Sequence, residues 1–156
     1  MKCYNLFIAF IFLLSFQKLS SQTVNGNWYG VGKVQLQGSH NDYMSELILQ
    51  QKNKEVKAIF NYYFKDSLLS DTIKGNFDAA TRKLSLQKFP IVYYLSDNTR
   101  NSVDCYMTGK FLLRISKTES VLSGSLIPEE AFKYSCPVIT INLKKSDNTD
   151  LVNPKE

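Results

Sequence analysis

Apolar and polar residues alternate with a period of two along most of this chain, from Trp28 to Lys144. No apolar stripe with the 3.6-residue period of a helix continues for more than two turns. Short polar reversals separate the alternating segments, at Lys52–Glu55, Asp78–Thr81 and Lys117–Glu119. The pattern therefore predicts an all-β domain whose strands each bury one face.

The segments between these reversals predict eight or nine short antiparallel strands. Pro90 breaks the pattern that begins at Lys83, and it predicts a strand edge or corner followed by a separate short strand, Ile91–Leu95. The longest apolar face runs from Val103 to Ile115 and predicts a bend or bulge near Gly109. Successive hairpins without long crossings favour a closed up-and-down barrel over a sandwich.

The two ends of the chain differ in composition from this central region. Lys2, the apolar run Leu6–Phe16 and the polar residues after it are typical of a secretory signal peptide, which we place at residues 1–22. The run has about 11 residues, whereas a membrane span needs roughly 20. A buried N-terminal strand or helix is the alternative. The barrel domain is then predicted at 23–145, and the polar residues 146–156 are predicted to be a disordered tail.

Cysteine usage agrees with an extracytoplasmic location. Cys3 leaves with the signal peptide, so Cys105 and Cys136 remain, and a lone pair in an oxidising compartment most often forms a disulfide. In a meander, the strands that begin at Val103 and Val138 run in the same direction with one strand between them. The loop before Val138 can therefore bring Cys136 to Cys105. A metal site or a catalytic thiol is the alternative, but His40 is the only histidine available to either.

Charge gives no sign of a nucleic-acid partner. The net charge of +5 falls to +3 when Lys2 and Lys18 leave with the signal peptide, and the remaining lysines are scattered. Nucleic-acid binding needs a basic stripe with exposed aromatic residues. We therefore expect no nucleic-acid partner and no transmembrane segment in the mature chain.

Gly26-Asn27-Trp28-Tyr29 resembles the Gly-x-Trp-Tyr signature that opens the first strand of lipocalins, and avidins and other calycins begin in a similar way. The resemblance implies that Trp28 closes one end of a barrel, that Gly26 lets the entering chain pass close beneath it, and that the interior holds a small hydrophobic ligand. The later Thr-Asp-Tyr motif and the arginine that packs over the tryptophan have no counterpart, and Lys144 and Lys145 are the nearest cations. The chain is thus calycin-like without being a typical lipocalin.

The large side chains predicted to face inward form the candidate ligand site. A ligand cavity with tyrosine hydroxyls that orient the ligand is one interpretation. A filled core is the other, because an eight-stranded barrel is just wide enough for side chains to fill it. The pattern does not decide between them. The predicted set is Trp28, Phe60, Tyr62, Phe64, Phe77, Met107 and Phe111.

Catalytic chemistry has little support. Ser39, His40 and Asp42 lie in one short loop, where neighbours cannot easily act as nucleophile, base and orienting group. No phosphate-binding loop or zinc-ligand pattern is present in the sequence. We therefore predict a non-enzymatic protein without cofactor or metal.

Two functions remain open. The first is a secreted or periplasmic barrel that binds a small hydrophobic or amphipathic molecule in its interior, and a solidly packed interior would count heavily against it. The second is an envelope or secreted interaction module that binds a protein or glycan through its outer face or loops. Outward Tyr29, Ile59, Tyr63 and Leu112 motivate the second, because apolar residues on a polar face can mark a contact patch.

Overall fold

The computed structural model describes residues 22–34, 42–64, 67–94 and 102–146, except for the side chains of Phe64 and Tyr94. Strands make up 77% of this part of the chain, with one short 3-10 helix, η1, between the last two strands. The strands are β1 (Gly26–Val34), β2 (Asp42–Lys52), β3 (Glu55–Phe64), β4 (Ser67–Asp78), β5 (Lys83–Tyr94), β6 (Ser102–Ile115), β7 (Ser120–Pro128) and β8 (Ile139–Lys145), and η1 is Glu130–Phe132.

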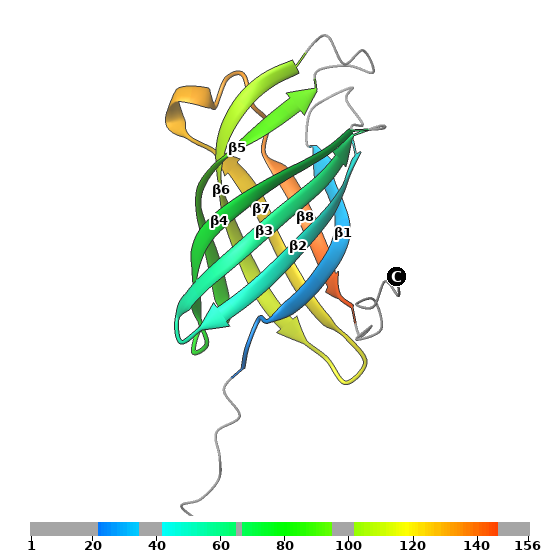
Figure 1. Ribbon diagram of the computed structural model, residues 1–156, viewed down its shortest axis with the longest axis vertical. Helices are drawn as coiled ribbons and strands as arrows, with labels where there is room; N and C mark the ends of the chain where they lie inside the picture. The colour runs from blue at the N-terminus through cyan, green and yellow to red at the C-terminus, as the bar shows by residue number, and fades with distance from the viewer. Residues whose placement is uncertain (1–21, 35–41, 65–66, 95–101, 147–156) are drawn as a thin grey trace, which may run out of the picture.

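The eight strands form a closed barrel in which each strand is antiparallel to the next (Figure 1). β1 closes the sheet against β8, with cross-strand partners from Trp28 opposite Lys145 to Val34 opposite Ile139. The predicted all-β, up-and-down antiparallel barrel is confirmed, at the lower of the two expected strand counts.

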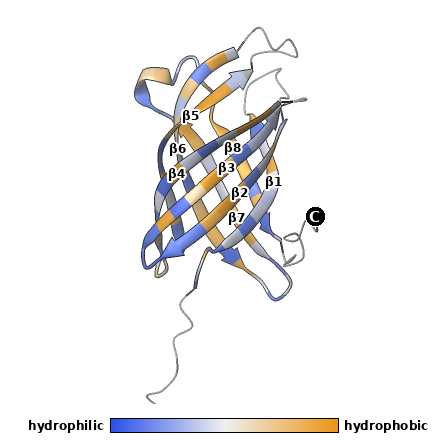
Figure 2. Ribbon diagram, viewed as in Figure 1, coloured by the Kyte–Doolittle hydropathy of each residue, from blue (hydrophilic) through white to orange (hydrophobic). Residues whose placement is uncertain are grey.

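Alternating side chains explain why the sheet closes around one core. In β2 the odd residues from Tyr43 to Leu49 are buried, while Met44 and Gln50 are exposed. Figure 2 shows the same alternation of hydrophobic and hydrophilic residues along the strands. The buried residues of all eight strands form a single hydrophobic cluster, because closure turns every inward face toward the same axis.

Tight turns connect the strands at one end of the barrel, which we call the turn end: residues 53–54, 79–82 and 116–119. Asn53 and Arg82 adopt positive φ angles of 58° and 57° there. Asp78 accepts hydrogen bonds from the Ala80 amide (3.0 Å) and the Thr81 hydroxyl (2.7 Å). These bonds, the Thr81 hydroxyl foremost, lower the pKa of Asp78. The opposite end, where β1, β3 and β5 finish, is called the loop end.

The structure corrects the prediction of two strands around Pro90. β5 is one strand that pairs with β6 on both sides of the proline, but a bulge between Leu86 and Phe89 shifts the register. A bend or bulge was predicted near Gly109, in β6. The structure has the bulge in the neighbouring strand β5, where it lies opposite the stretch from Gly109 to Met107. Beyond the bulge β5 has no β4 partner, so Pro90 does lie at a strand edge, as predicted.

The β7–β8 connection folds back over the outside of β6. The Glu129 amide donates to the Tyr106 carbonyl (2.9 Å), and the rings of Phe132 and Tyr106 lie 5.5 Å apart. This path brings Cys136 to Cys105, and the two form the predicted disulfide with a Cα–Cα distance of 5.9 Å. The described residues contain no helix of the length and hydropathy that a membrane crossing requires.

The predicted signal peptide and tail lie outside the described residues, except for Gln22 and Ser146. The Ser146 amide donates to the Asn27 carbonyl (2.9 Å), so the described chain ends beside the strand with which the barrel begins.

Candidate functional site

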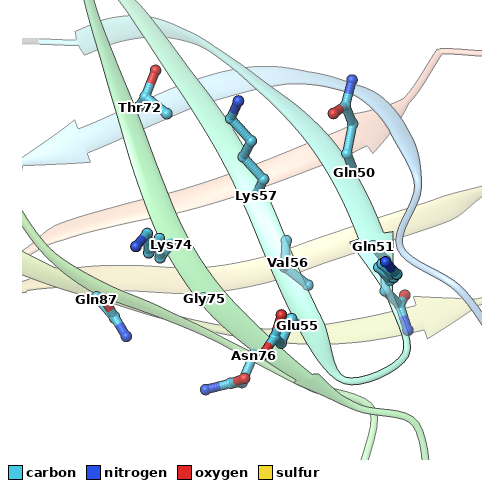
Figure 3. A pocket seen from close by; sticks show the side chains of 11 residues that line it. Gln50, Gln51, Glu55, Val56, Lys57, Thr72, Lys74, Gly75, Asn76 and Gln87 are labelled. Carbon is cyan, nitrogen blue, oxygen red and sulfur yellow. The ribbon is translucent and has the colours of Figure 1, made fainter.

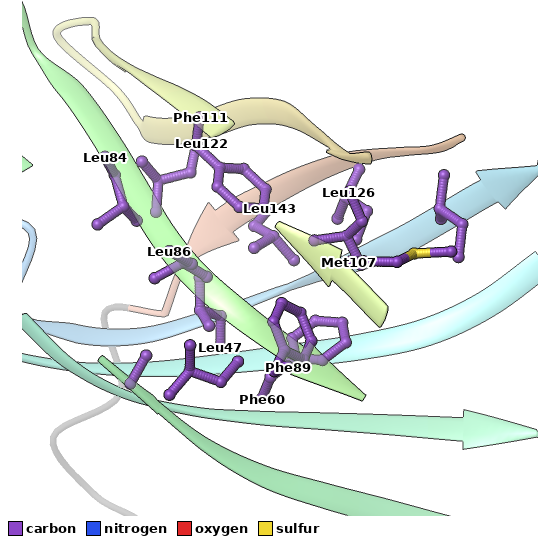
Figure 4. Close-up of a cluster of buried hydrophobic side chains, with 14 of the residues drawn as sticks. Leu47, Phe60, Leu84, Leu86, Phe89, Met107, Phe111, Leu122, Leu126 and Leu143 are labelled. Atoms are coloured by element: carbon purple, nitrogen blue, oxygen red, sulfur yellow. The ribbon is translucent and has the colours of Figure 1, made fainter. Parts of the chain in front are cut away.

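The side chains predicted to line the interior point inward wherever they are described. Their exposed fractions are 0% for Trp28 and Met107, 1% for Phe77, 2% for Phe60 and Tyr62, and 4% for Phe111. Figure 4 shows three of them, Phe60, Met107 and Phe111, among the leucines of the core. The side chain of Phe64 lies outside the described part. Their inward position is confirmed, and ligand binding by them stays a prediction.

Four aromatic rings form a continuous chain through the interior toward the loop end. Tyr43 meets Tyr62 edge-on at 6.4 Å, Tyr62 stacks on Phe60 at 5.6 Å, and Phe60 meets Phe89 edge-on at 5.7 Å. Tyr43 and Phe89 are absent from the predicted site. Tyr43 lies on the same face of β2 as Leu47 and Leu49, so the alternating pattern already indicated that it points inward.

The bulge in β5 explains why Phe89 is harder to find. Leu84 and Leu86 point inward at even positions, and regular alternation would bring Lys88 inward next. The extra residue in the bulge reverses the parity, so that Phe89 and Ile91 are buried and Lys88 reaches solvent. The change of apolar residues from even to odd numbers is the sequence signal of this bulge.

The described side chains pack closely in the interior toward the loop end. The cavity that they line there has a volume of about 10 Å³. A cavity of that size holds about one water molecule, whereas small-molecule sites usually measure about 300–1,000 Å³. At this level of the barrel, the described side chains therefore form a packed core. Residues lining this cavity are Tyr43, Ser45, Phe60, Tyr62, Ile91, Leu126, Ile139 and Ile141.

Trp28 lies near the turn end and is completely buried. Its indole N–H donates to the carbonyl of Val24 (2.9 Å), in the segment that enters the barrel. The ammonium of Lys145 lies 5.8 Å from the centre of the indole ring, so a lysine occupies the place that the resemblance gives to an arginine. Gly26 has a φ of +123°, which few residues other than glycine adopt, and this turns the chain beneath the barrel.

The space beside Trp28 is closed by β8. A Cβ atom at Gly30 would lie 2.0 Å from the carbonyl oxygen of Asn142, so the glycine is needed for the close approach of β1 to β8. A Cβ at Gly32 would lie 3.0 Å from the side chain of Ile139. The backbone of β8 therefore lies against Gly30, and the side chains of Ile139 and Ile141 lie against Gly32.

β4 and β5 separate toward the loop end. Gly75–Asp78 of β4 pairs with Lys83–Leu86 of β5, next to the turn that joins the two strands. From there to the loop end, each strand has one edge without a partner strand in the described chain. Tyr62 reaches across from β3, and its hydroxyl accepts a hydrogen bond from the amide of Val92 (2.9 Å). Pro90 has no amide to donate. At Val92 and Pro90, the edge of β5 therefore has no backbone amide that needs a hydrogen bond from β4.

Asp71 lies beside this separation, at a position of β4 whose neighbours Leu69 and Ile73 point inward. Its carboxyl group is only partly exposed, and desolvation raises its pKa. An inward charge on an unpaired strand discourages the addition of a foreign strand.

The outer face of β1–β4 carries a row of exposed apolar side chains. Val31 lies opposite Met44, Met44 opposite Tyr63, and Tyr63 opposite Leu68. Their exposed fractions are 39%, 67%, 42% and 54%. We call these four residues the apolar row. At strand spacing it extends over about 14 Å.

Three of the four residues predicted to point outward are exposed: Tyr29 by 40%, Tyr63 by 42% and Leu112 by 37%. The fourth, Ile59, lies on the outward face of β3 between buried Ala58 and Phe60, but it is half-buried. A hydrogen bond to Glu46 raises the pKa of Tyr29, which lies two residues before Val31 of the apolar row on the same face of β1. Leu112 belongs to β6, apart from the row. The row itself was not predicted, because it depends on cross-strand register.

Ser39 and His40, which the sequence places in one loop with Asp42, lie outside the described residues. Within residues 22–34, 42–64, 67–94 and 102–146, no three His, Cys, Asp or Glu side chains are grouped as a metal site requires. No protein-family model matches the sequence, and a search of curated proteins finds no relative.

Proposed function

We propose that this protein is a non-enzymatic, extracytoplasmic interaction module that binds a partner protein through the outer face of β1–β4. The apolar row is the observation that carries the proposal. Exposed apolar residues are common when they are scattered, but a contiguous set on a folded surface marks an interaction site.

The composition of the row favours a protein over a glycan as partner. It offers aliphatic side chains, a methionine that adapts to an uneven surface and a tyrosine at its centre. Glu46 and the hydroxyl of Tyr29 supply a polar rim beside it. An apolar centre with a polar rim is the usual anatomy of a protein interface.

Two features support the proposed extracytoplasmic location. Residues 1–22 have the composition of a signal peptide, and the Cys105–Cys136 disulfide needs an oxidising compartment to persist. Both support a secreted or periplasmic site of action.

A cross-linking experiment tests the proposal. A photoreactive residue at Met44, in protein expressed in its own host, should capture one defined partner, and the same residue at Leu112 should not. The partner is then purified, and its affinity is measured for Met44→Asp and Leu68→Asp. We expect a loss of at least about tenfold for each, since truncating a hot-spot residue of an interface costs about 2 kcal/mol or more.

Leu112→Asp provides the matched control, because Leu112 is also an exposed leucine on an outer strand face. Equal losses in Leu112→Asp and Leu68→Asp would contradict the proposal. The cross-linker could instead capture a second copy of the same chain, and sedimentation could show a dimer that Met44→Asp converts to a monomer. These two results together would show that the apolar row mediates self-association and does not bind a different protein.

Interior ligand binding is the second candidate, and the calycin-like barrel supports it. The small cavity lies where Tyr43, Ser45 and Tyr62 bring polar groups into the core, near the separation of β4 and β5. A ligand would have to displace aromatic rings in order to enter. Native mass spectrometry of protein from its own host tests this function: a retained small molecule would support it, and ligand-free protein would leave the outer face as the better account.

A further inference from the structure

Outside the apolar row, the outer surface of β2–β5 is hollowed near the turn end. The hollow has a volume of about 610 Å³, which lies in the range of small-molecule and oligosaccharide sites. Figure 3 shows its polar lining, with Gln50, Lys57, Thr72, Lys74 and Gln87 on successive strands. We call it the lysine hollow.

Two lysines occupy directly opposite positions on neighbouring strands of this surface. Lys57 on β3 lies opposite Lys74 on β4. The Phe77 amide donates to the Lys54 carbonyl (2.8 Å), and hydrogen-bonded pairs alternate with non-bonded pairs along an antiparallel ladder. Lys57 and Lys74 therefore form a non-hydrogen-bonded pair, which is the kind that brings two side chains closest.

The described structure gives neither ammonium group an acidic partner. Three other lysines do form ion pairs, Lys88 with Glu129, Lys133 with Glu130 and Lys144 with Glu119. Like charges that face each other across a ladder destabilise a sheet, so an unrelieved pair at the centre of a hollow is unfavourable without a bound anion.

The rest of the lining adds hydrogen-bonding groups and some further positive charge. Gln50 lies opposite Lys57, and Gln87, Asn76 and Thr72 border the same space. Glu55 also lines it but lies opposite Lys52 at the end of the β2–β3 hairpin. Three lysines against one glutamate leave an excess of positive charge.

We propose that the lysine hollow binds an acidic glycan, a saccharide that bears sulfate or carboxylate groups. The ammonium groups of Lys57 and Lys74 hold the anionic group, and the surrounding amides and hydroxyl bind sugar hydroxyls. Among the described residues that line the hollow, none is aromatic. The surface thus lacks the stacking platforms that single-stranded nucleic acids use.

Titration of the full secreted chain with defined oligosaccharides tests this site. A sulfated heparin-derived hexasaccharide and an oligogalacturonate represent the two acidic groups, and maltohexaose is the neutral control. We expect at least one acidic oligosaccharide to bind, with an affinity that falls as salt rises, while maltohexaose does not bind. Absence of binding by both acidic oligosaccharides at low salt would overturn the proposal.

The double variant Lys57→Gln/Lys74→Gln should weaken binding by at least about tenfold and reduce the salt dependence. Lys33→Gln/Lys117→Gln removes the same charge from exposed positions outside the hollow, and should retain affinity within about twofold. Equal losses in the two double variants would reveal general charge attraction and refute the site. Two further results would refute the glycan class: equal affinity for a single-stranded oligonucleotide, or displacement of the oligosaccharide by equimolar inorganic phosphate.

A stability measurement guards against misfolding of the variant. Because Lys57→Gln/Lys74→Gln removes a like-charge contact, its unfolding midpoint without ligand should equal or exceed that of the wild type. Acidic oligosaccharide should raise the midpoint of the wild type only. A variant stabilised by the oligosaccharide as strongly as the wild type would count against the proposal. Met44→Asp should bind the oligosaccharide normally, so this site and the partner-protein surface can fail independently.

Discussion

Trp28 shows how one residue joins several parts of the molecule. Its indole ring is buried under the entering chain, and its N–H is satisfied by the carbonyl of Val24. The Val24 amide in turn donates to the side-chain oxygen of Gln51 (3.0 Å) on β2. Loss of the indole N–H would leave a buried carbonyl without this partner, which is costly away from water.

We therefore expect Trp28→Phe to lower the free energy of unfolding by about 2–4 kcal/mol, from the lost hydrogen bond and the smaller ring together. Urea denaturation followed by far-ultraviolet circular dichroism measures this, because the chain's only tryptophan is absent from the variant. Tyr29→Phe changes the neighbouring exposed ring and should cost less than about 1 kcal/mol. Similar losses in both variants would show that the Trp28 contacts carry no special weight.

Asp71 gives a residue-scale prediction about pH. Burial raises the pKa of this carboxyl group above its unfolded value, so the folded state favours the protonated form. The stability that this carboxyl group contributes is fully present below its pKa in the unfolded chain. It is lost as the pH rises through its pKa in the folded protein. Asp71→Asn should therefore gain stability relative to the wild type as pH rises from below the unfolded pKa to above the raised folded pKa, with no further change at higher pH.

Urea midpoints of the wild type and Asp71→Asn across this range test the sign. Thr72→Ala alters the next residue without removing an ionisable group, and it should keep the wild-type pH profile. A stability difference that does not change with pH would show that the Asp71 carboxyl titrates alike in both states.

At the scale of elements, the separation of β4 from β5 is the main departure from a regular barrel. The bulge turns β5 so that it follows β6 alone, and the Tyr62 hydroxyl replaces the missing strand at the Val92 amide. The edge is thus held by a side chain from the strand beyond β4. Such an edge is the weakest part of the barrel wall, because a side-chain bond replaces a continuous ladder.

Tyr62→Phe should therefore destabilise the protein by about 1–2 kcal/mol and raise hydrogen exchange most strongly at Val92. Tyr63→Phe, one residue later and outward, should leave exchange at Val92 unchanged. Hydrogen–deuterium exchange read by NMR at single amides distinguishes the two. Unchanged protection of Val92 in Tyr62→Phe would mean that another group satisfies this amide.

At the scale of the whole molecule, the Cys105–Cys136 disulfide ties the β7–β8 connection to β6. The two cysteines are separated by 31 residues, and closing a loop of that size limits the unfolded chain. Cys105→Ala/Cys136→Ala should lower the free energy of unfolding by about 3–4 kcal/mol in the chain-entropy account. Denaturant titration of the variant and of oxidised wild type measures the difference.

Intact mass after thiol labelling is the direct check on the bond. Unreduced secreted protein should take up no label, and reduced protein should take up label at both cysteines. Two labelled thiols before reduction would contradict the disulfide. A stability loss well below the expected range would indicate that the unfolded chain is already compact.

Much of the fold could be predicted from the sequence, because strands and turns are indicated by residues that are close together along the chain. Alternation with a period of two predicted the strands, and the faces of 43–49 and 56–62 are buried as the pattern requires. The parity of Phe89 and the continuity of β5 through Pro90 were missed. Both depend on the bulge in β5 between Leu86 and Phe89, which is seen in the pairing of β5 with β6.

The candidate site was predictable only in part. The inward residues were identified because burial follows from the alternation. Their packing was not, since it depends on how eight faces meet and leave a cavity of only about 10 Å³. The apolar row and the lysine hollow were both missed, although every residue in them is visible in the sequence. Lys57 and Lys74 are far apart along the chain and belong to no common sequence motif, so only the register of β3 and β4 shows that they are neighbours.

The sequence by itself determined the all-β class, the inward faces, most of the turns and the compatibility of Cys105 with Cys136, because each follows from local alternation, turn residues or strand direction. The tertiary structure decided which strands separate, whether the core is filled, and which outward residues meet. Cross-strand register is the physical reason. A shift of one residue in β4 would exchange its two faces, and with them both the apolar row and the facing lysines.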